Sequence, residues 1–236
     1  MSLSIIIPCF NEEDNIKQTI DSIKSKITVQ DYEIILINDF STDDTEKEII
    51  SICKNYNFIK YYNNTKKGLG TAIDIGIKNS NKIFVVILMA DLSDNIMDLN
   101  LYYQNISSKK VDAVFGSRFL KNSSLEGYPL NKLFLNRFFN YVTKLFFWSD
   151  YNDFTNAFKI YRKEVLIKLK PFVSENFNIF LEIPLKIISR KYKYIIIPIS
   201  WKNRKFGDSK FKIVELGSKY LFTLLYCWLE KVLIKK

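Results

Sequence analysis

The sequence predicts an α/β fold in which helices cover a mostly parallel central sheet. Short runs rich in Ile and Val, such as residues 32–37 and 83–88, alternate with helical patterns, as buried parallel strands do. Both runs end at acidic clusters, and ligands of such sheets bind beyond the carboxyl ends of the strands. A hydrophobic content of 47% over 236 residues is also enough to build a large core.

The first half of the chain alternates strictly between apolar runs and amphipathic stretches. We expect strands at 3–8, 32–38, 58–62, 83–88 and 111–117, and helices at 13–26, 43–55, about 68–79 and 95–107. This order predicts right-handed βαβ units. Ser41 or Thr42 can cap the second helix, whose positive end Asp43 and Asp44 would complement, so capping competes with ligand binding as the role of these two acids.

After Ser117 the alternation ends. We expect an apolar helix at 130–147, a strand at 158–161, helices at 163–169 and 178–190, a strand at 193–201, a basic loop at 202–212 and a helix at 213–234. With seven Gly and five Pro and no Gly/Ser/Pro-rich stretch, nothing marks a linker. We therefore predict one domain at residues 1–212, followed by an amphipathic helix at 213–236.

The net charge of +10 is concentrated in the second half, because residues 156–236 carry 18 Lys or Arg against 6 Asp or Glu. That half should meet an anionic partner. The chain has no histidine, which excludes a His-based mechanism, and its three cysteines lack metal-ligand spacing and indicate a reducing compartment. The sequence contains no motif typical of DNA- or RNA-binding proteins beside its positive charge, so we expect no nucleic-acid binding.

Targeting and membrane-spanning signals are also missing from the pattern. The apolar run at 3–7 is too short for a secretory signal, and the run Tyr220–Leu229 is too short to span a bilayer. We therefore expect a cytoplasmic protein without a transmembrane helix.

Seven motifs occur in order along residues 3–212. They are IPCFNEE at 7–13, NDFSTDDT at 38–45, GLGTA at 68–72, ADLSD at 90–94, GSRF at 116–119, DFTNAFK at 153–159 and RKFGDSK at 204–210. Together the first four resemble the family 2 glycosyltransferases of GT-A fold, a Rossmann-like three-layer sandwich. The last three resemble the branch that transfers sugars to dolichyl or polyprenyl phosphate.

This resemblance implies a nucleotide-sugar site. Pro8, Asn11, Glu12 and Asp39 would line the nucleoside pocket, and a carboxylate such as Asp39 can accept N–H bonds from a uracil or guanine edge. For Asn11 and Glu12 the alternative is a helix start. The loop that contains Gly68 and Gly70 would lie near the nucleotide sugar, although two glycines before a helix also suit a simple turn. Arg204 belongs to the same expected set.

The resemblance also implies Mg²⁺ or Mn²⁺ held against the donor diphosphate. Asp91 is the expected ligand, with Asp94 and the Ser93 hydroxyl completing the site directly or through water, because hard cations take oxygen ligands. Met89 stands where the family's common Asp-Ala-Asp pattern has its first aspartate. This departure puts the metal affinity in doubt.

A lipid phosphate acceptor is already an anion, so it needs no general base. The enzyme instead needs cationic side chains that bind this phosphate. Arg118 and Arg137 match arginines that the family uses for that phosphate, and arginine suits bidentate phosphate contacts. Lys210 lies in the segment that resembles a mobile loop over the active site. We expect catalysis from Asp91, Arg118, Arg137 and Lys210. The alternatives are a surface ion pair for Arg118, solvent exposure for Arg137 and a solvated face for the basic loop.

The final helix combines apolar and aromatic residues with lysines at its edges, as interfacial helices do. We expect peripheral contact with an anionic membrane on its cytoplasmic face, although packing on the sheet or a dimer contact would also explain this helix.

The leading hypothesis is metal-dependent, inverting transfer of a hexose from a donor of the GDP-mannose or UDP-glucose type to a polyprenyl phosphate. One alternative is a family 2 enzyme that extends a cell-surface glycan on a sugar hydroxyl, for which Glu182 is the candidate base. The other is an inactive membrane scaffold of the same fold.

Overall fold

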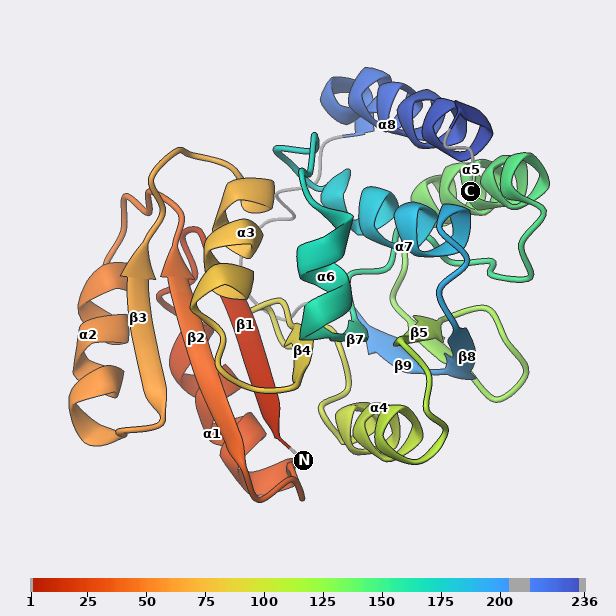
Figure 1. Ribbon diagram of the computed structural model, residues 1–236. Coiled ribbons are helices and arrows are strands. Elements are labelled where there is room, and N and C mark those ends of the chain that lie inside the picture. The colour runs from red at the N-terminus through yellow and green to blue at the C-terminus, as the bar shows by residue number, and fades with distance from the viewer. Residues whose placement is uncertain (1, 204–212, 234–236) are drawn as a thin grey trace.

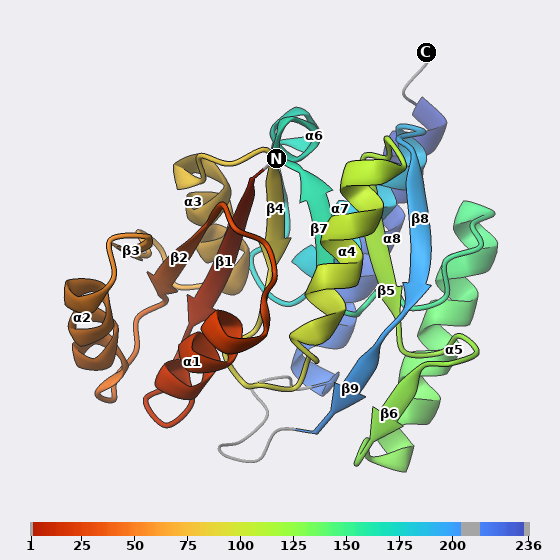
Figure 2. The same cartoon turned by 90° about the horizontal axis from the view of Figure 1, so that it is seen from below.

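A seven-stranded sheet forms the centre of the molecule, with helices on both of its faces (Figures 1 and 2). The computed structural model describes residues 2–203 and 213–233. The strand order is β3-β2-β1-β4-β7-β5-β8. The strands are β1 (Leu3–Cys9), β2 (Tyr32–Asn38), β3 (Ile59–Asn63), β4 (Phe84–Ile87), β5 (Ala113–Ser117), β7 (Lys159–Arg162) and β8 (Tyr194–Pro198). All neighbours are parallel except β7, which is antiparallel to both β4 and β5.

The helices form two layers, which confirms the expected three-layer arrangement. One face is covered by α1 (Ile16–Lys26), α2 (Thr45–Asn55) and α4 (Met97–Ser108), and the other by α3 (Leu69–Asn79), α6 (Lys163–Leu169) and α7 (Ile179–Ser189). Central strands are buried on both sides: Ile6 and Ile35 face one core, and Ile5 and Ile34 face the other. This explains their continuous apolar runs.

Two long helices lie outside the second helical layer, α5 (Leu130–Phe147) and α8 (Ile213–Leu233) (Figure 1). Tyr220, Leu224 and Cys227 of α8 are buried in the same core as α7. The helix expected at 213–234 is therefore present and packs on another helix rather than on the sheet. Among the described residues no helix is long and apolar enough to cross a membrane.

The prediction of one strand at 193–201 is wrong in its extent. The chain leaves the main sheet after Pro198, and β9 (Ser200–Lys202) pairs with β6 (Ser124–Glu126) in a separate ribbon. The sequence analysis missed β6, because three residues are too few to show a period of two.

Candidate active site

The loops that follow β1, β2 and β4 lie at one edge of the sheet, because these three strands are parallel neighbours in register. Asn11 joins the first two loops. It has a positive φ of 53°, its N–H donates to the Ser41 hydroxyl at 3.1 Å, and its side-chain oxygen accepts the Thr42 N–H at 2.8 Å. The alternative role of Asn11 as a helix cap is wrong, since α1 begins only at Ile16.

Ser41 and Thr42 make their contacts with Asn11 and not with the start of α2. At that start the carboxylate of Asp43 accepts the Thr45 N–H at 3.1 Å. Asp43 is therefore the residue that caps this helix, in place of Ser41 or Thr42. Glu12 is buried behind this turn, where its N–H donates to Thr45 Oγ1 at 2.8 Å and its carboxylate accepts Asn15 Nδ2 at 2.8 Å.

Pro8 is buried in β1, opposite Ile37 of β2. Its contact with a nucleoside stays a prediction, as does that of Asn11 and Glu12.

Asp39 connects the end of β2 to the start of α3. One oxygen of its buried carboxylate, Oδ1, accepts Asn64 Nδ2 at 2.7 Å and the Gly68 N–H at 2.8 Å. The structure thus brings Asp39 and Gly68 together, as the nucleotide-site prediction requires.

Glycine is required at positions 68 and 70 because the backbone there lies very close to the backbone of Ser174 and Glu175. Gly68 has φ 146°, and a Cβ there would lie 2.6 Å from the Glu175 carbonyl oxygen; a Cβ on Gly70 would lie 1.9 Å from that of Ser174. The Gly70 N–H donates to the Glu175 oxygen at 3.0 Å. Both glycine N–H groups therefore serve internal contacts, and the position of the loop beside the nucleotide sugar stays a prediction.

The loop after β4 holds two buried carboxylates, those of Asp91 and Asp94. Asp91 Oδ1 accepts the Ser93 N–H at 3.0 Å. Burial, and to a smaller extent the negative charge of Asp91, raise the pKa of Asp94 to about 7. A divalent cation would relieve both effects, so the oxygen-rich loop fits Mg²⁺ or Mn²⁺ chemically.

This loop does not make a complete metal cage. Among the described residues no group of three or more Asp, Glu, Cys or His could hold a metal. Met89 packs against the core, so it adds no ligand. A cation at Asp91 and Asp94 would take its remaining ligands from phosphate and water.

A pocket of about 490 Å³ opens beside these two carboxylates. Polar side chains in and just before α1, including Asn15 and Gln18, form one wall, and Trp201 of β9 belongs to another. Asp94 also forms an isolated antiparallel bridge with Trp201. The volume and the mixed lining are typical of a small-molecule site.

Arg118 follows β5 directly and is buried in an ion pair with Asp153. Its Nε and Nη2 donate to the two carboxylate oxygens at 2.8 and 2.7 Å, and its own N–H also donates to Asp153 at 2.9 Å. Burial would lower the pKa of Arg118, but Asp153 outweighs it, and the net pKa is raised. Arg118 therefore forms an ion pair, but in the interior, so the alternative of a surface ion pair is wrong in its location. The phosphate contact of Arg118 stays a prediction.

Arg137 on α5 is exposed, and its guanidinium lies 4.4 Å from the centre of the Phe119 ring. Arg118 contacts the same ring at 5.5 Å. The two arginines predicted to bind the acceptor thus both lie close to one aromatic side chain.

Lys159 is a site residue to which the sequence analysis gave no role, although it belongs to the segment 153–159. It is fully buried, and its ammonium donates to the carbonyls of Phe154 and Asn156. Burial lowers the pKa of Lys159 to about 7. The carbonyl of Phe154, five residues earlier in the chain, is the partner of Lys159. No sequence pattern indicates such a contact for a lysine in an apolar strand. Arg204 and Lys210 lie outside the described residues.

Glu182 cannot act as a general base on an acceptor. It is fully buried in α7 and forms a 2.7 Å ion pair with Lys186, whereas a base must reach the proton that it removes. The candidate base of the glycan-extending alternative is therefore wrong.

The comparisons agree with this geometry. Residues 4–170 match glycosyl transferase family 2. The chain belongs to this family.

Several curated relatives cover most of the chain. It is 28% identical to a dolichol-phosphate mannosyltransferase of Pyrococcus furiosus, covering 90% of this chain and 60% of that protein. It is 22% identical to a polyprenol monophosphomannose synthase of Mycolicibacterium smegmatis, covering 90% and 86%. It also spans 37% of a 22% identical glycosyltransferase of Haloferax volcanii, AglD, so two of these relatives are much longer.

Among solved structures, a glucosyl-3-phosphoglycerate synthase of Mycobacterium tuberculosis, in complex with Mn²⁺, uridine diphosphate and phosphoglyceric acid, superposes with a TM-score of 0.73 at 15% identity. The match covers 100% of this chain and 80% of the synthase. At this identity the likeness establishes the GT-A fold alone.

Proposed function

We propose that this chain transfers a hexose from a nucleotide sugar to a polyprenyl phosphate, with inversion at the anomeric carbon. The observation that carries the proposal is the placement of Arg118 and Arg137 beside one aromatic ring, that of Phe119. The names of two relatives, a dolichol-phosphate mannosyltransferase and a polyprenol monophosphomannose synthase, support the acceptor class. Donors of the GDP-mannose or UDP-glucose type are both compatible with an Asp39 carboxylate.

In this mechanism an oxygen of the lipid phosphate attacks the anomeric carbon, the bond from that carbon to the diphosphate breaks, and the nucleoside diphosphate leaves. No proton has to be removed from the acceptor, so the burial of Glu182 is no obstacle. Asp39 would orient the nucleoside, the pocket beside Asp91 would hold the hexose, and Arg137 would bind the acceptor phosphate. A divalent cation bound by Asp91 and Asp94 would neutralise the leaving diphosphate.

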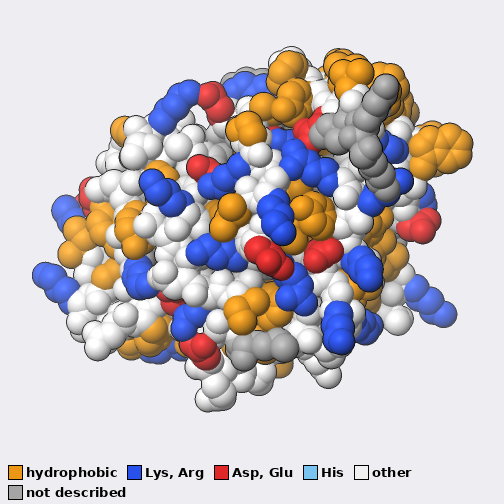
Figure 3. All heavy atoms as spheres, viewed as in Figure 1, with side chains coloured by type: hydrophobic (Ala, Val, Ile, Leu, Met, Phe, Trp, Pro, Cys, Tyr) orange, Lys and Arg blue, Asp and Glu red, His pale blue; other side chains and the backbone are white. Residues whose placement is uncertain are grey.

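A lipid acceptor requires a surface that meets a membrane, and α5 and α8 supply one. Hydrophobic side chains gather over both helices in Figure 3. The most exposed of them are Leu130, Phe134, Phe138, Tyr141 and Trp148 in and beside α5, and Phe222, Val232 and Leu233 in α8. We propose that this apolar face lies on an anionic membrane at its cytoplasmic side, with Lys132, Lys144 and Lys219 near the headgroups.

The test is a transfer assay. The protein is incubated with Mg²⁺ or Mn²⁺, radiolabelled GDP-mannose or UDP-glucose, and a polyprenyl phosphate. We expect label from one donor to enter the organic phase, and none when polyprenol replaces its phosphate. Label that appears only on a soluble glycan would favour hydroxyl transfer, and no nucleotide-sugar binding at all would favour the inactive scaffold.

A further inference from the structure

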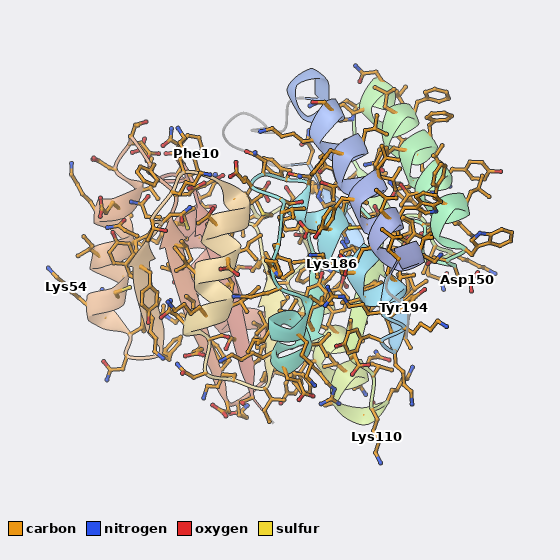
Figure 4. The ribbon with its side chains drawn as sticks, turned by 45° about the horizontal axis from the view of Figure 1, so that its top comes forward. Phe10, Lys54, Lys110, Asp150, Lys186 and Tyr194 are labelled. Carbon is orange, nitrogen blue, oxygen red and sulfur yellow. The ribbon has the colours of Figure 1, made fainter. Side chains whose placement is uncertain are left out.

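A buried ion pair lies in the middle of α7. Glu182 and Lys186 are one helical turn apart, and both are almost completely buried. Figure 4 labels Lys186, which lies beneath α8. Isolated buried charges are costly, so such a pair persists where its remaining hydrogen bonds are satisfied. Here most of them are satisfied by one segment of backbone, residues 170–178, which we name the support segment. Lys186 also donates to the Leu169 carbonyl at 3.4 Å and lies 4.0 Å from a carboxylate oxygen of Glu230.

The carboxylate of Glu182 accepts two successive N–H groups of the support segment. Val173 N lies 3.0 Å from Oε1, and Ser174 N lies 2.8 Å from Oε2. Lys186 donates to the Pro171 carbonyl at 2.5 Å. The ion pair therefore fixes the peptide groups on both sides of Phe172.

The next two peptide groups of the support segment contact Gly68 and Gly70 of the predicted nucleotide site. The carbonyl oxygens of Ser174 and Glu175 are the atoms that leave no room for a Cβ on Gly70 and Gly68. The Glu175 oxygen also accepts the Gly70 N–H at 3.0 Å. The loop 64–70, which we name the donor loop, thus rests directly on the support segment.

The donor loop in turn holds Asp39. Both Asn64 and Gly68 donate to its Oδ1. An unbroken series of contacts therefore runs from the Glu182 carboxylate through the support segment and the donor loop to Asp39.

Helix α8 joins this arrangement through a neutral contact. Thr223 is fully buried, and its hydroxyl accepts Asn178 Nδ2 at 2.9 Å and lies 3.3 Å from the Ser174 hydroxyl. The support segment is consequently held from α7 by charge and from α8 by a hydroxyl.

We propose that Glu182 is a positioning residue for the nucleotide-sugar site, which fixes Asp39 and the donor loop through the support segment. This inference rests on the proposed function for the ligand's identity. The effect of Glu182 on the donor loop can be measured without any ligand.

The chain offers a matched control. Glu33 is also a buried glutamate, with an ion pair to Lys60 at 2.7 Å and a backbone N–H donor, that of Asn81. It lies at the start of β2, whereas Asp39 follows the end of that strand. Glu33→Gln therefore removes the same kind of charge at a comparable depth and at the other edge of the sheet.

The experiment compares the wild type, Glu182→Gln and Glu33→Gln by amide hydrogen exchange and by calorimetric titration with GDP and UDP in the presence of Mn²⁺. We expect Glu182→Gln alone to speed exchange at the N–H groups of Gly68 and Gly70 and to weaken nucleotide binding by about tenfold. Both variants should lower Tm. If Glu182→Gln does not fold, Thr223→Val makes the same test from α8, with a smaller shift in the same two measurements.

Each outcome decides a separate point. Unchanged exchange in the donor loop, with unchanged nucleotide affinity, would overturn the positioning role. A loss of kcat at unchanged donor affinity and unchanged exchange would also overturn it. Failure of the wild type to bind either nucleotide would defeat the proposed function, while faster exchange confined to Glu182→Gln would still support the contact series.

Discussion

Arg118 and Asp153 form a buried pair in which three N–H groups, two from the guanidinium and one from the backbone, converge on a single carboxylate. The pair joins the end of β5 to the loop before β7. Arg118 therefore has a structural role in addition to its predicted contact with the acceptor. Arg137, which is exposed and lies beside Phe119, does not share this structural role.

We expect this difference to separate the two arginines in mutagenesis. Arg137→Lys keeps the charge but loses the planar fork, so it should raise the KM for polyprenyl phosphate about tenfold or more and leave the KM for the nucleotide sugar unchanged. Arg118→Lys should lower Tm as well, because it breaks the buried pair. Steady-state kinetics and thermal unfolding of both variants provide the check. Wild-type transfer by Arg137→Lys would remove that residue from the acceptor site.

Asp91→Asn should reduce transfer at least a hundredfold without loss of stability. The substitution removes the expected anionic metal ligand, and it also removes the repulsion that helps to raise the pKa of Asp94. Asp94→Asn should require more Mn²⁺ but retain more activity. Transfer rates measured over a range of Mn²⁺ concentrations, together with Tm, test both statements. Normal turnover of Asp91→Asn at low metal would contradict the metal assignment.

Asp39→Asn is designed to keep the internal contacts of the carboxylate. The amide oxygen can still accept the N–H groups of Asn64 and Gly68, while an acceptor for a nucleobase edge becomes a donor. We expect the binding free energy of the nucleoside diphosphate to become less favourable by about 1.5–3 kcal/mol, the range for a charged hydrogen bond. Calorimetry with GDP and UDP measures this change. Equal affinity in variant and wild type would show that the nucleoside binds elsewhere.

Membrane binding should depend on side chains of α5 and α8 that point outward. Removal of residues 213–236 is a poor test, because Leu224 and Cys227 are part of the core. Trp148→Ser combined with Phe222→Ser should instead reduce flotation with anionic vesicles, and added salt should reduce it further. Ile83→Ser, an exposed apolar residue before β4, is the matched control and should float like the wild type. Equal flotation of all three proteins would place the membrane contact elsewhere.

Lys159 should make stability depend on pH near neutrality. Burial lowers its folded pKa to about 7, so below pH 7 the lysine is charged in both states and its burial cost is present in full. Between that value and its unfolded pKa the unfolded state binds more protons, and the unfolding free energy rises with pH by up to about 1.4 kcal/mol per unit. Urea unfolding at pH 6 and pH 9 should show a larger gain in the wild type than in Lys159→Met. Equal gains would mean that the ammonium stays charged.

The sequence predicted the part of the fold that rests on local patterns. The apolar runs gave β1, β2 and β4, and their order placed Asp39 and Asp91 at one edge. The pairing of Arg118 with Asp153 joins positions far apart in the chain, and no period or spacing records it. Glu182 was wrongly predicted to be a general base, because a single acidic residue in a basic region suggests a catalytic role. Its spacing of four residues from Lys186 in an apolar helix was the available signal of a buried pair.

The reversed direction of β7 has a consequence for the way the site is assembled. In a fully parallel sheet, functional side chains come from residues that follow strands. Because β7 enters between β4 and β5 from the opposite end, the residues that precede it arrive at the same edge, and Asp153 reaches the residue after β5 in this way. One inverted strand thus lets the second half of the chain contribute to an edge built by the first half.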